Sequence, residues 1–213
     1  ALSGARPVQL ADGSLAGDVR EAAAGGRFLD ALDRWVAREG GANDVVPDEA
    51  VFASGWFLYL GYELAAEVEP SLALPRSRHA RASAWRMRGA IVRDRVSGEV
   101  SVVAEGDATP EFRRQVDADL DCLPPASSGS GHLLDGDIVE EPPERFLLGV
   151  HAVLEAIARG DVYQANLSRS WRAQLAPGAT ACDLYRALRQ ANPAPFAALA
   201  QLGGFALLSS SPE

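Results

Sequence analysis

Lysine is absent from the 213-residue sequence, and all 20 basic side chains are arginine. Without lysine, the sequence offers no ammonium nucleophile, no Schiff base and no phosphate-gripping lysine. Acidic residues outnumber basic ones by 29 to 20, which gives a net charge of −9 and a pI near 4.9. Nucleic acids and anionic membranes reward basic surfaces, so this composition argues against either as a partner.

Cysteine is almost as scarce, since Cys122 and Cys182 are the only two. Two cysteines cannot build a disulfide framework or a cysteine-based zinc site, so a reducing cytoplasm is the expected location. No run of about 18 apolar residues occurs, and the first residues lack the order of a signal peptide, so we expect no membrane span. The three histidines have no partner at ligand spacing, and we predict no metal site among these residues.

Apolar periodicity in the first part of the chain predicts both helices and strands. Residues 1–26 are expected to form a loop, followed by a helix from Phe28 that Gly40-Gly41 stops. A buried strand is expected over 51–62, and a hairpin over 85–94 and 99–105. Thr109 is the predicted N-cap of a short helix, and the acids at 63, 67 and 69 are expected to lie in a solvated turn.

An abrupt change of composition separates this part from the rest. Residues 124–131 are rich in Pro, Ser and Gly, and acidic residues with a Pro pair follow. Segments of this kind join subdomains. We therefore predict an N-terminal subdomain over 1–123, a linker over 124–143 and the start of a second domain over 144–213.

The second part has the clearest patterning. A helical stripe over 146–157 ends at Gly160, and residues 162–174 alternate like a strand. Thr180 and Asp183 predict a capping box for a helix that Asn192-Pro193 ends. Two fully buried strands, 196–202 and 205–209, are predicted on either side of a two-residue glycine turn. Antiparallel sheets with flanking helices predict an α+β fold.

Three features of this part could carry chemistry. Gln164, Asn166 and Ser168 share the polar face of the predicted strand, which is either a solvated face or the lining of a pocket. Gln164 could hold a substrate by amide hydrogen bonds but cannot act as a base, because a carboxamide does not titrate near neutral pH. Glu213 is either a surface turn residue or, in an apolar setting, a general acid. Pro195 and Phe196 form a rigid extended turn or a stiff wall for a flat ring.

Four motifs in order carry a resemblance to a known family. They are Gly160-Asp161-Val162-Tyr163-Gln164-Ala165-Asn166-Leu167-Ser168-Arg169, Leu184-Tyr185-Arg186-Ala187-Leu188-Arg189, Asn192-Pro193-Ala194-Pro195-Phe196 and Ser210-Ser211-Pro212-Glu213. They resemble the opening of the chorismate-binding domain of aminodeoxychorismate synthase component I, with anthranilate synthase component I close behind. Residues 55–64 resemble an upstream strand of the same family. The resemblance implies an incomplete chorismate-binding β-sandwich.

The resemblance also implies roles for individual residues. The family's Ser-Pro-Glu glutamate protonates the C4 hydroxyl of chorismate as it leaves, and that role falls on Glu213. The Gln of its Tyr-Gln motif lies near C2 of the ring, which is Gln164 here. Relatives that add water at C2, the isochorismate and salicylate synthases, carry Lys there, so Gln164 favours an amine-adding member. Asn166 and Phe196 favour the aminodeoxychorismate branch.

Other ligands and partners follow from the same resemblance. It implies chorismate as substrate, ammonia from a glutamine amidotransferase subunit, and Mg²⁺ held by residues beyond the point that corresponds to Glu213. Pro195 and Phe196 correspond to part of a tryptophan pocket, although the Leu-Leu-x-Ser-like stretch of its other half is not seen here. Whether tryptophan binds is therefore left open.

The expected activity is that of a chorismate-utilising, amine-transferring synthase in p-aminobenzoate and folate synthesis. Two alternatives remain at this point: anthranilate synthase component I, or a non-catalytic module that binds an aromatic ligand or a subunit. The family's Pro-Ile-(Lys or Ala)-Gly-Thr motif would separate the two enzymes, and it lies after Glu213. We therefore expect residues 1–213 to be an N-terminal fragment that is inactive by itself.

Overall fold

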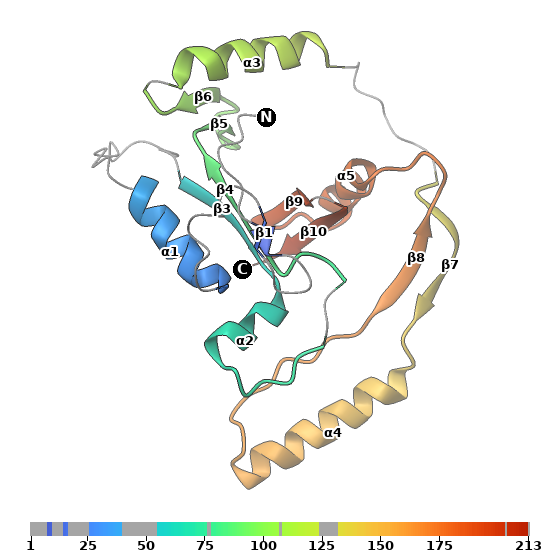
Figure 1. The fold of residues 1–213 in the computed structure, drawn as a ribbon. Coiled ribbons are helices and arrows are strands. Elements are labelled where there is room, and N and C mark those ends of the chain that lie inside the picture. The colour runs from blue at the N-terminus through green and yellow to red at the C-terminus, as the bar shows by residue number, and fades with distance from the viewer. Residues whose placement is uncertain are drawn as a thin grey trace. The chain divides into compact units, whose positions relative to one another are not determined.

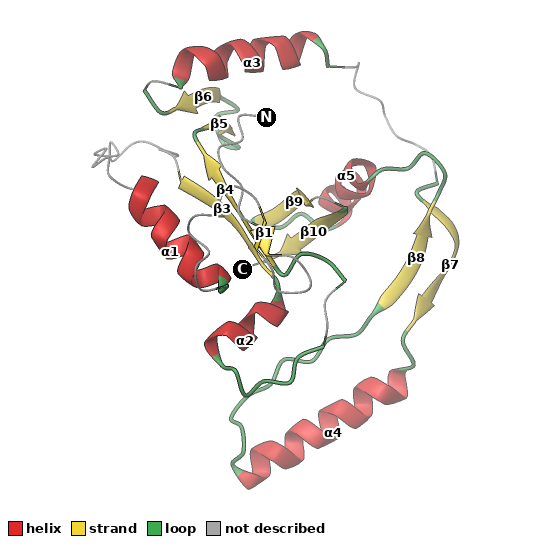
Figure 2. Ribbon diagram, viewed as in Figure 1, coloured by secondary structure: helices red, strands yellow, loops and turns green. Residues whose placement is uncertain are grey.

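Helices alternate with antiparallel strands along the chain in a computed structural model (Figure 1 and Figure 2). The structure describes residues 8–9, 15–16, 26–39, 55–75, 78–106, 108–123, 132–202 and 204–212. The chain divides into two compact units, Ala1–Pro125 and Ala126–Glu213. All the strand pairs are antiparallel, which confirms the predicted α+β fold class.

A four-stranded sheet forms the centre of the first unit. Its strand order is β2-β1-β4-β3. The strands are β1 (Val8–Gln9), β2 (Leu15–Ala16), β3 (Gly55–Leu60) and β4 (Ala82–Met87). Two of these strands lie in the segment predicted as loop. β3 lies at the edge of the sheet, so its predicted burial is wrong: Leu60 is 51% exposed.

The core of the first unit lies between this sheet and α1 (Phe28–Glu39). Phe28 and Trp35 project from the helix at the predicted apolar spacing and are buried. Ala82 and Ala84 of β4 lie under them, and their small side chains let the helix approach the strand closely. The Trp35 ring packs against that of Trp56, with ring centroids 4.3 Å apart. The periodicity from Phe28 therefore identified the helix and most of its buried face, although it included the exposed Val36 and omitted the fully buried Ala31.

Glu67 caps the N-terminus of α1, although it lies far from this helix in the sequence. It lies in α2 (Ala65–Val68), which follows a 3-10 turn at Tyr62–Leu64. Its two carboxylate oxygens accept the backbone N–H groups of Phe28 at 2.9 Å and Leu29 at 3.1 Å. A carboxylate satisfies unpaired N–H groups and complements the helix dipole there. For Glu67, the predicted solvated turn is therefore wrong.

Replacing Glu67 with Ala should lower the free energy of unfolding of the first unit by about 1–2 kcal/mol, because two helical N–H groups lose their acceptors. Urea titration followed by tryptophan fluorescence measures this loss. The exposed Glu99 is a suitable control, since its side chain accepts no hydrogen bond that the structure gives. Equal stability of the Glu67→Ala and Glu99→Ala proteins would show that the cap contributes nothing.

A hairpin and a helix complete the first unit. β5 (Gly89–Arg93) pairs with β6 (Val100–Ala104), and α3 (Thr109–Asp121) follows. The strand predicted over 85–94 is divided at Arg88 between two sheets. A Cβ atom on Gly89 would lie 2.7 Å from the Phe112 ring, so only glycine allows this approach of α3. Thr109 is not the N-cap, because its hydroxyl donates to the Glu105 carbonyl at 3.0 Å.

The second unit contains the following elements: β7 (Leu134–Glu140), α4 (Pro143–Arg159), β8 (Trp171–Leu175), α5 (Ala181–Ala191), β9 (Phe196–Leu202) and β10 (Phe205–Ser211). β7 pairs with β8, and β9 pairs with β10. β7 lies inside the range predicted as linker. Its acidic sequence has no apolar alternation, and it becomes a strand through backbone pairing with β8.

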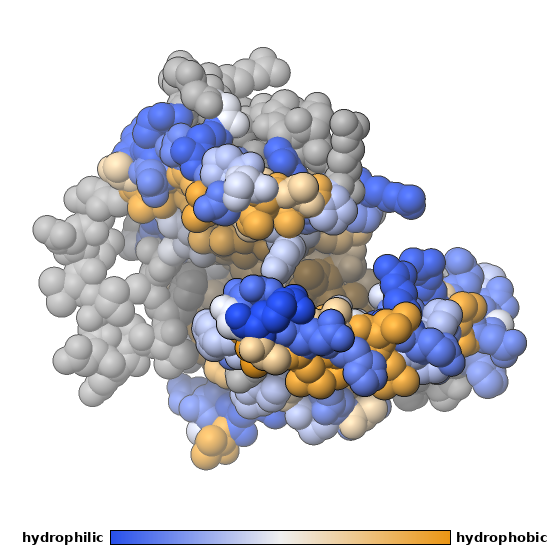
Figure 3. All heavy atoms as spheres, turned by 90° about the horizontal axis from the view of Figure 1, so that it is seen from below, coloured by the Kyte–Doolittle hydropathy of each residue, from blue (hydrophilic) through white to orange (hydrophobic). Residues whose placement is uncertain are grey.

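The helix α4 follows its sequence pattern at the C-terminal end but begins at Pro143, the last residue of the predicted linker. It ends at Gly160, whose φ of 81° lies in the left-handed region that glycine adopts without strain. None of its residues is buried, and several large apolar side chains are exposed, with Leu148 at 70%. Apolar surface runs along this helix in Figure 3.

The helix α5 and the hairpin after it also match the prediction. Thr180 accepts the Asp183 N–H, and Asp183 accepts the Thr180 N–H, which completes the predicted capping box. The hairpin turns at Gly204, whose φ is 105°. Gly203 lies outside the described residues. The predicted full burial of β9 and β10 is wrong, because Leu202 is the only residue of either strand that is buried.

The capping box makes the stability of this unit depend on pH. The Thr180 hydroxyl and N–H groups donate to Asp183 and hold the pKa of its carboxyl below its ordinary value of 3.8. A lowered folded-state pKa stabilises the fold above the unfolded value, and that stabilisation is lost as the pH falls through the folded value. Asp183→Asn should therefore lower the melting temperature at pH 7 but have little effect well below pH 3.8.

Thermal melts of both proteins across this pH range test the capping-box prediction. The matched control is Asp137→Asn, since Asp137 is exposed on β7 and accepts no hydrogen bond that the structure gives. A pH-independent difference between wild type and Asp183→Asn would contradict the assignment.

Candidate functional site

The segment between α4 and β8 carries Gln164 and Asn166. The strand predicted over 162–174 exists only from Trp171, and residues 162–170 have no regular structure. The Glu141 N–H donates to the Ser170 carbonyl at 2.9 Å, just where β7 ends. Earlier residues of the segment lie next to no described strand, so their alternation cannot form a ladder. Both Gln164 and Asn166 are exposed.

The β9–β10 hairpin brings two of the sequence motifs together. Phe196 begins β9 and lies opposite Ser211 in the ladder. The Ser210 hydroxyl donates to the Asn192 carbonyl, which ties the end of β10 to the turn before β9. Pro195 and Phe196 are exposed, as a ligand-binding wall requires, with Phe196 at 64%. No described contact links Gln164 or Asn166 to this hairpin.

Glu213 lies outside the described residues. Ser211 and Pro212 precede it directly in the sequence, and Ser211 lies opposite Phe196 of β9 in the ladder. The predicted role of Glu213 as a general acid stays a prediction.

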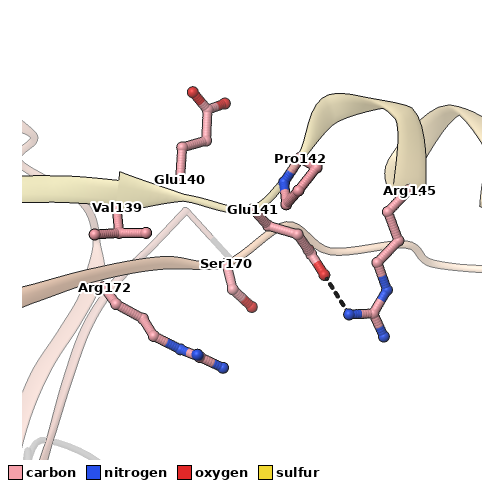
Figure 4. A pocket seen from close by; sticks show the side chains of 7 residues that line it. All are labelled: Val139, Glu140, Glu141, Pro142, Arg145, Ser170 and Arg172. Carbon is pink, nitrogen blue, oxygen red and sulfur yellow. Dashed lines mark ion pairs between the residues drawn. The ribbon is translucent and has the colours of Figure 1, made fainter.

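A cavity that the sequence did not predict lies where β7, β8 and α4 meet. Its volume is about 430 Å³, and its lining residues are Val139, Glu140, Glu141, Pro142, Arg145, Ser170 and Arg172. Figure 4 shows that Ser170, Arg172, Glu141 and Arg145 direct their polar groups toward one space, whereas Glu140 points away. The only sequence signal was the run of alternate polar residues, of which Ser170 and Arg172 are two.

The charged side chains around the start of β8 fall into two groups, on opposite sides of the strand. On one side, Arg169 donates to the Glu140 carboxylate and lies over the Trp171 ring, 5.1 Å from its centroid. On the other side, Arg145 pairs with Glu141 at 3.0 Å. Arg172 forms no ion pair with any described residue. Two of the three arginines are therefore neutralised, and Arg172 leaves one positive charge at the cavity.

Metal-binding groups are not gathered in this part of the protein. Among the described residues, no cluster of three or more His, Cys, Asp and Glu side chains could hold a metal ion. The Mg²⁺ ligands that the resemblance implies are expected beyond Glu213 and stay a prediction. No helix in the described ranges has both the length and the apolar character needed to cross a membrane.

Comparison with known proteins first defines the fold. Anthranilate synthase component I from Streptococcus pneumoniae TIGR4 superimposes with a TM-score of 0.74 at 20% sequence identity. The match covers 100% of this chain and 49% of that protein. The two units thus have the fold of part of such a component I.

The family follows from the sequence match. A family model described as chorismate binding enzyme matches residues 20–213, and the chain belongs to this family of enzymes. Anthranilate synthase component 1 of Cereibacter sphaeroides is 32% identical over 179 residues, and aminodeoxychorismate synthase of Streptomyces griseus is 34% identical over 174. Each match covers 76% of this chain, but the chain spans only 35% and 23% of those proteins.

Proposed function

We propose that this chain is part of component I of an aminodeoxychorismate synthase. The complete protein would convert chorismate and ammonia into 4-amino-4-deoxychorismate, the precursor of p-aminobenzoate in folate synthesis. Gln164 supports an amine-adding member, because water-adding relatives have Lys at this place, and Asn166 and Phe196 carry the choice of the aminodeoxychorismate branch. A carboxamide cannot take a proton from water near neutral pH, so activation of water at C2 is disfavoured. The similarity to aminodeoxychorismate synthase of Streptomyces griseus supports the same choice.

Each predicted site residue has a place in this reaction. Glu213 would give its proton to the C4 hydroxyl, which leaves as water, and ammonia would supply the nitrogen that replaces it at C4. Gln164 and Asn166, both exposed on the segment before β8, would hold the ring through amide hydrogen bonds. Pro195 and Phe196 would supply an apolar wall. The ladder supports the grouping of this wall with Glu213, since it pairs Phe196 with Ser211.

Partners and cofactor of the complete protein belong to the same proposal. A glutamine amidotransferase subunit would deliver the ammonia, and Mg²⁺ would be held by residues outside this chain. The few cysteines and the acidic composition are compatible with a cytoplasmic enzyme. Tryptophan is a candidate ligand of the Pro195-Phe196 wall.

Anthranilate synthase component I is the second candidate function. It is favoured by the similarity to the Cereibacter sphaeroides protein of that name, which is 32% identical over 179 residues. The two candidates differ in what becomes of the ring. An anthranilate synthase eliminates pyruvate and yields an aromatic product, whereas an aminodeoxychorismate synthase leaves the enolpyruvyl group in place.

Product analysis on the complete protein tests the proposal. The protein is incubated with chorismate, ammonium and magnesium chloride, and the products are separated by liquid chromatography with mass detection. We expect 4-amino-4-deoxychorismate without release of pyruvate. Formation of anthranilate and pyruvate would establish the second candidate, and formation of isochorismate would overturn both.

A further inference from the structure

We propose that the cavity formed by β7, β8 and the first turn of α4 binds a small monocarboxylate with an apolar body. Its site is separate from Gln164, Asn166, Pro195 and Phe196, none of which lines it. The inference does not depend on the proposed function.

The positive charge of Arg172 at the cavity favours binding of an anion. Arg172 has no ion-pair partner among the described residues, whereas Glu141 is paired with Arg145 at 3.0 Å and Glu140 accepts from Arg169. A guanidinium presents a planar fork of donors that matches a carboxylate in a bidentate geometry. The Arg172 guanidinium, unpaired among the described residues, is therefore suited to one carboxylate group.

The Ser170 hydroxyl is a second hydrogen-bond donor for the bound carboxylate. Ser170 and Arg172 are two residues apart at the start of β8, so they face the same side. In Figure 4 the Ser170 hydroxyl and the Arg172 guanidinium are directed into the same space. Among the described residues the Ser170 hydroxyl has no hydrogen-bond partner, which leaves it able to donate to a carboxylate oxygen.

The surroundings favour a single negative charge over a double one. Glu140 and Glu141 both line the cavity, and their carboxylates repel anions even though each is paired with an arginine. One carboxylate balances Arg172, whereas a phosphate dianion would bring an excess charge next to two acids. Carboxylate is therefore preferred to phosphate.

The remaining lining offers a small, exposed apolar surface, with Val139 65% exposed. Val139 lies opposite Arg172 in the ladder, and Pro142 precedes α4. With the stem of Arg172 they provide carbon surface beside the polar groups. The volume of about 430 Å³ is within the range of small-molecule sites.

Phenylacetate is a direct probe, and phenylacetamide is a neutral control of the same shape. Titration of the 213-residue chain, followed by ¹⁵N chemical shifts, should give saturable changes centred on Ser170 and Arg172 with phenylacetate only. Arg172→Gln should weaken binding about tenfold, and Ser170→Ala about threefold. Arg189→Gln removes the same charge from α5, outside the cavity lining, and should leave binding unchanged.

Several outcomes would overturn the inference. They are no saturation at Ser170 and Arg172 by about 50 mM phenylacetate, equal binding of phenylacetamide, tighter binding of inorganic phosphate, or unchanged affinity of Arg172→Gln. The comparison of the three ligands uses the unmodified chain, so it decides the matter even if a variant fails to fold. This test measures ligand binding and not enzyme activity, so its result is independent of whether the proposed function is correct.

Discussion

Replacing Glu213 with Gln in the complete protein should lower the chorismate-dependent rate about 10²–10⁴-fold, the usual contribution of a positioned general acid. Glutamine keeps the size and one acceptor oxygen of glutamate but has no proton to give to a leaving hydroxyl. The loss should appear in kcat, while the KM for chorismate changes little. Steady-state assays with saturating ammonium measure both constants.

A matched control and an independent readout sharpen this prediction. Glu155 is 75% exposed on α4, so Glu155→Gln should leave the rate unchanged. Because a general acid must be protonated to act, the fall in rate on the alkaline side of the pH–rate profile should also change in Glu213→Gln. A near-normal rate for this variant would remove Glu213 from the mechanism and leave only its motif resemblance.

Replacing Phe28 with Ala should lower the free energy of unfolding of the first unit by about 3–5 kcal/mol. Phe28 is fully buried between α1 and the sheet, so its removal leaves a cavity that the Ala-rich surface of β4 cannot fill. Urea titration followed by tryptophan fluorescence reports on this core directly, because Trp35 and Trp56 lie in it.

The control for Phe28→Ala is an apolar residue outside any core. Val96 is 99% exposed, and Val96→Ala should change stability by no more than about 0.5 kcal/mol. A loss below about 1 kcal/mol in Phe28→Ala would mean that the helix does not pack on the sheet as described.

Local signals accounted for the elements that were predicted correctly. α4 and α5 carry a period of 3.6 residues together with end signals, namely Gly160 for one and the Thr180–Asp183 box for the other. The β9–β10 hairpin has a glycine pair between two apolar runs. In each case the residues that decide the structure lie within a few positions of one another.

Elements that depend on distant partners were missed. β7 has an acidic, linker-like sequence and exists through its pairing with β8, about 35 residues later. Residues 162–168 alternate like a strand but pair with no described strand. Glu67 looked like one acid of a solvated turn, although its acceptor role depends on α1, 38 and 39 residues earlier.

The candidate site residues also divide into those that a local signal identifies and those that depend on distant partners. Sequence motifs selected the predicted site residues, which are Gln164, Asn166, Pro195, Phe196 and Glu213. A motif gives a residue's position in the sequence but not the residues that lie near it in the fold. The register of the hairpin supplied one such neighbour by pairing Phe196 with Ser211. The cavity at Arg172 could not be predicted, because it requires the β7–β8 register and ion pairs between separate segments.

The register of the β9–β10 ladder fixes which residue of β10 lies opposite each residue of β9. Its register pairs Phe205 with Leu202 at the turn and Ser211 with Phe196 at the far end. One residue inserted at the turn would advance β10 by about 3.3 Å and reverse the face on which each of its side chains lies. The pairing of Ser211 with Phe196 is therefore set by a count of residues around a glycine turn, and a single-residue insertion there should be as damaging to a site at this end of the hairpin as a substitution within it.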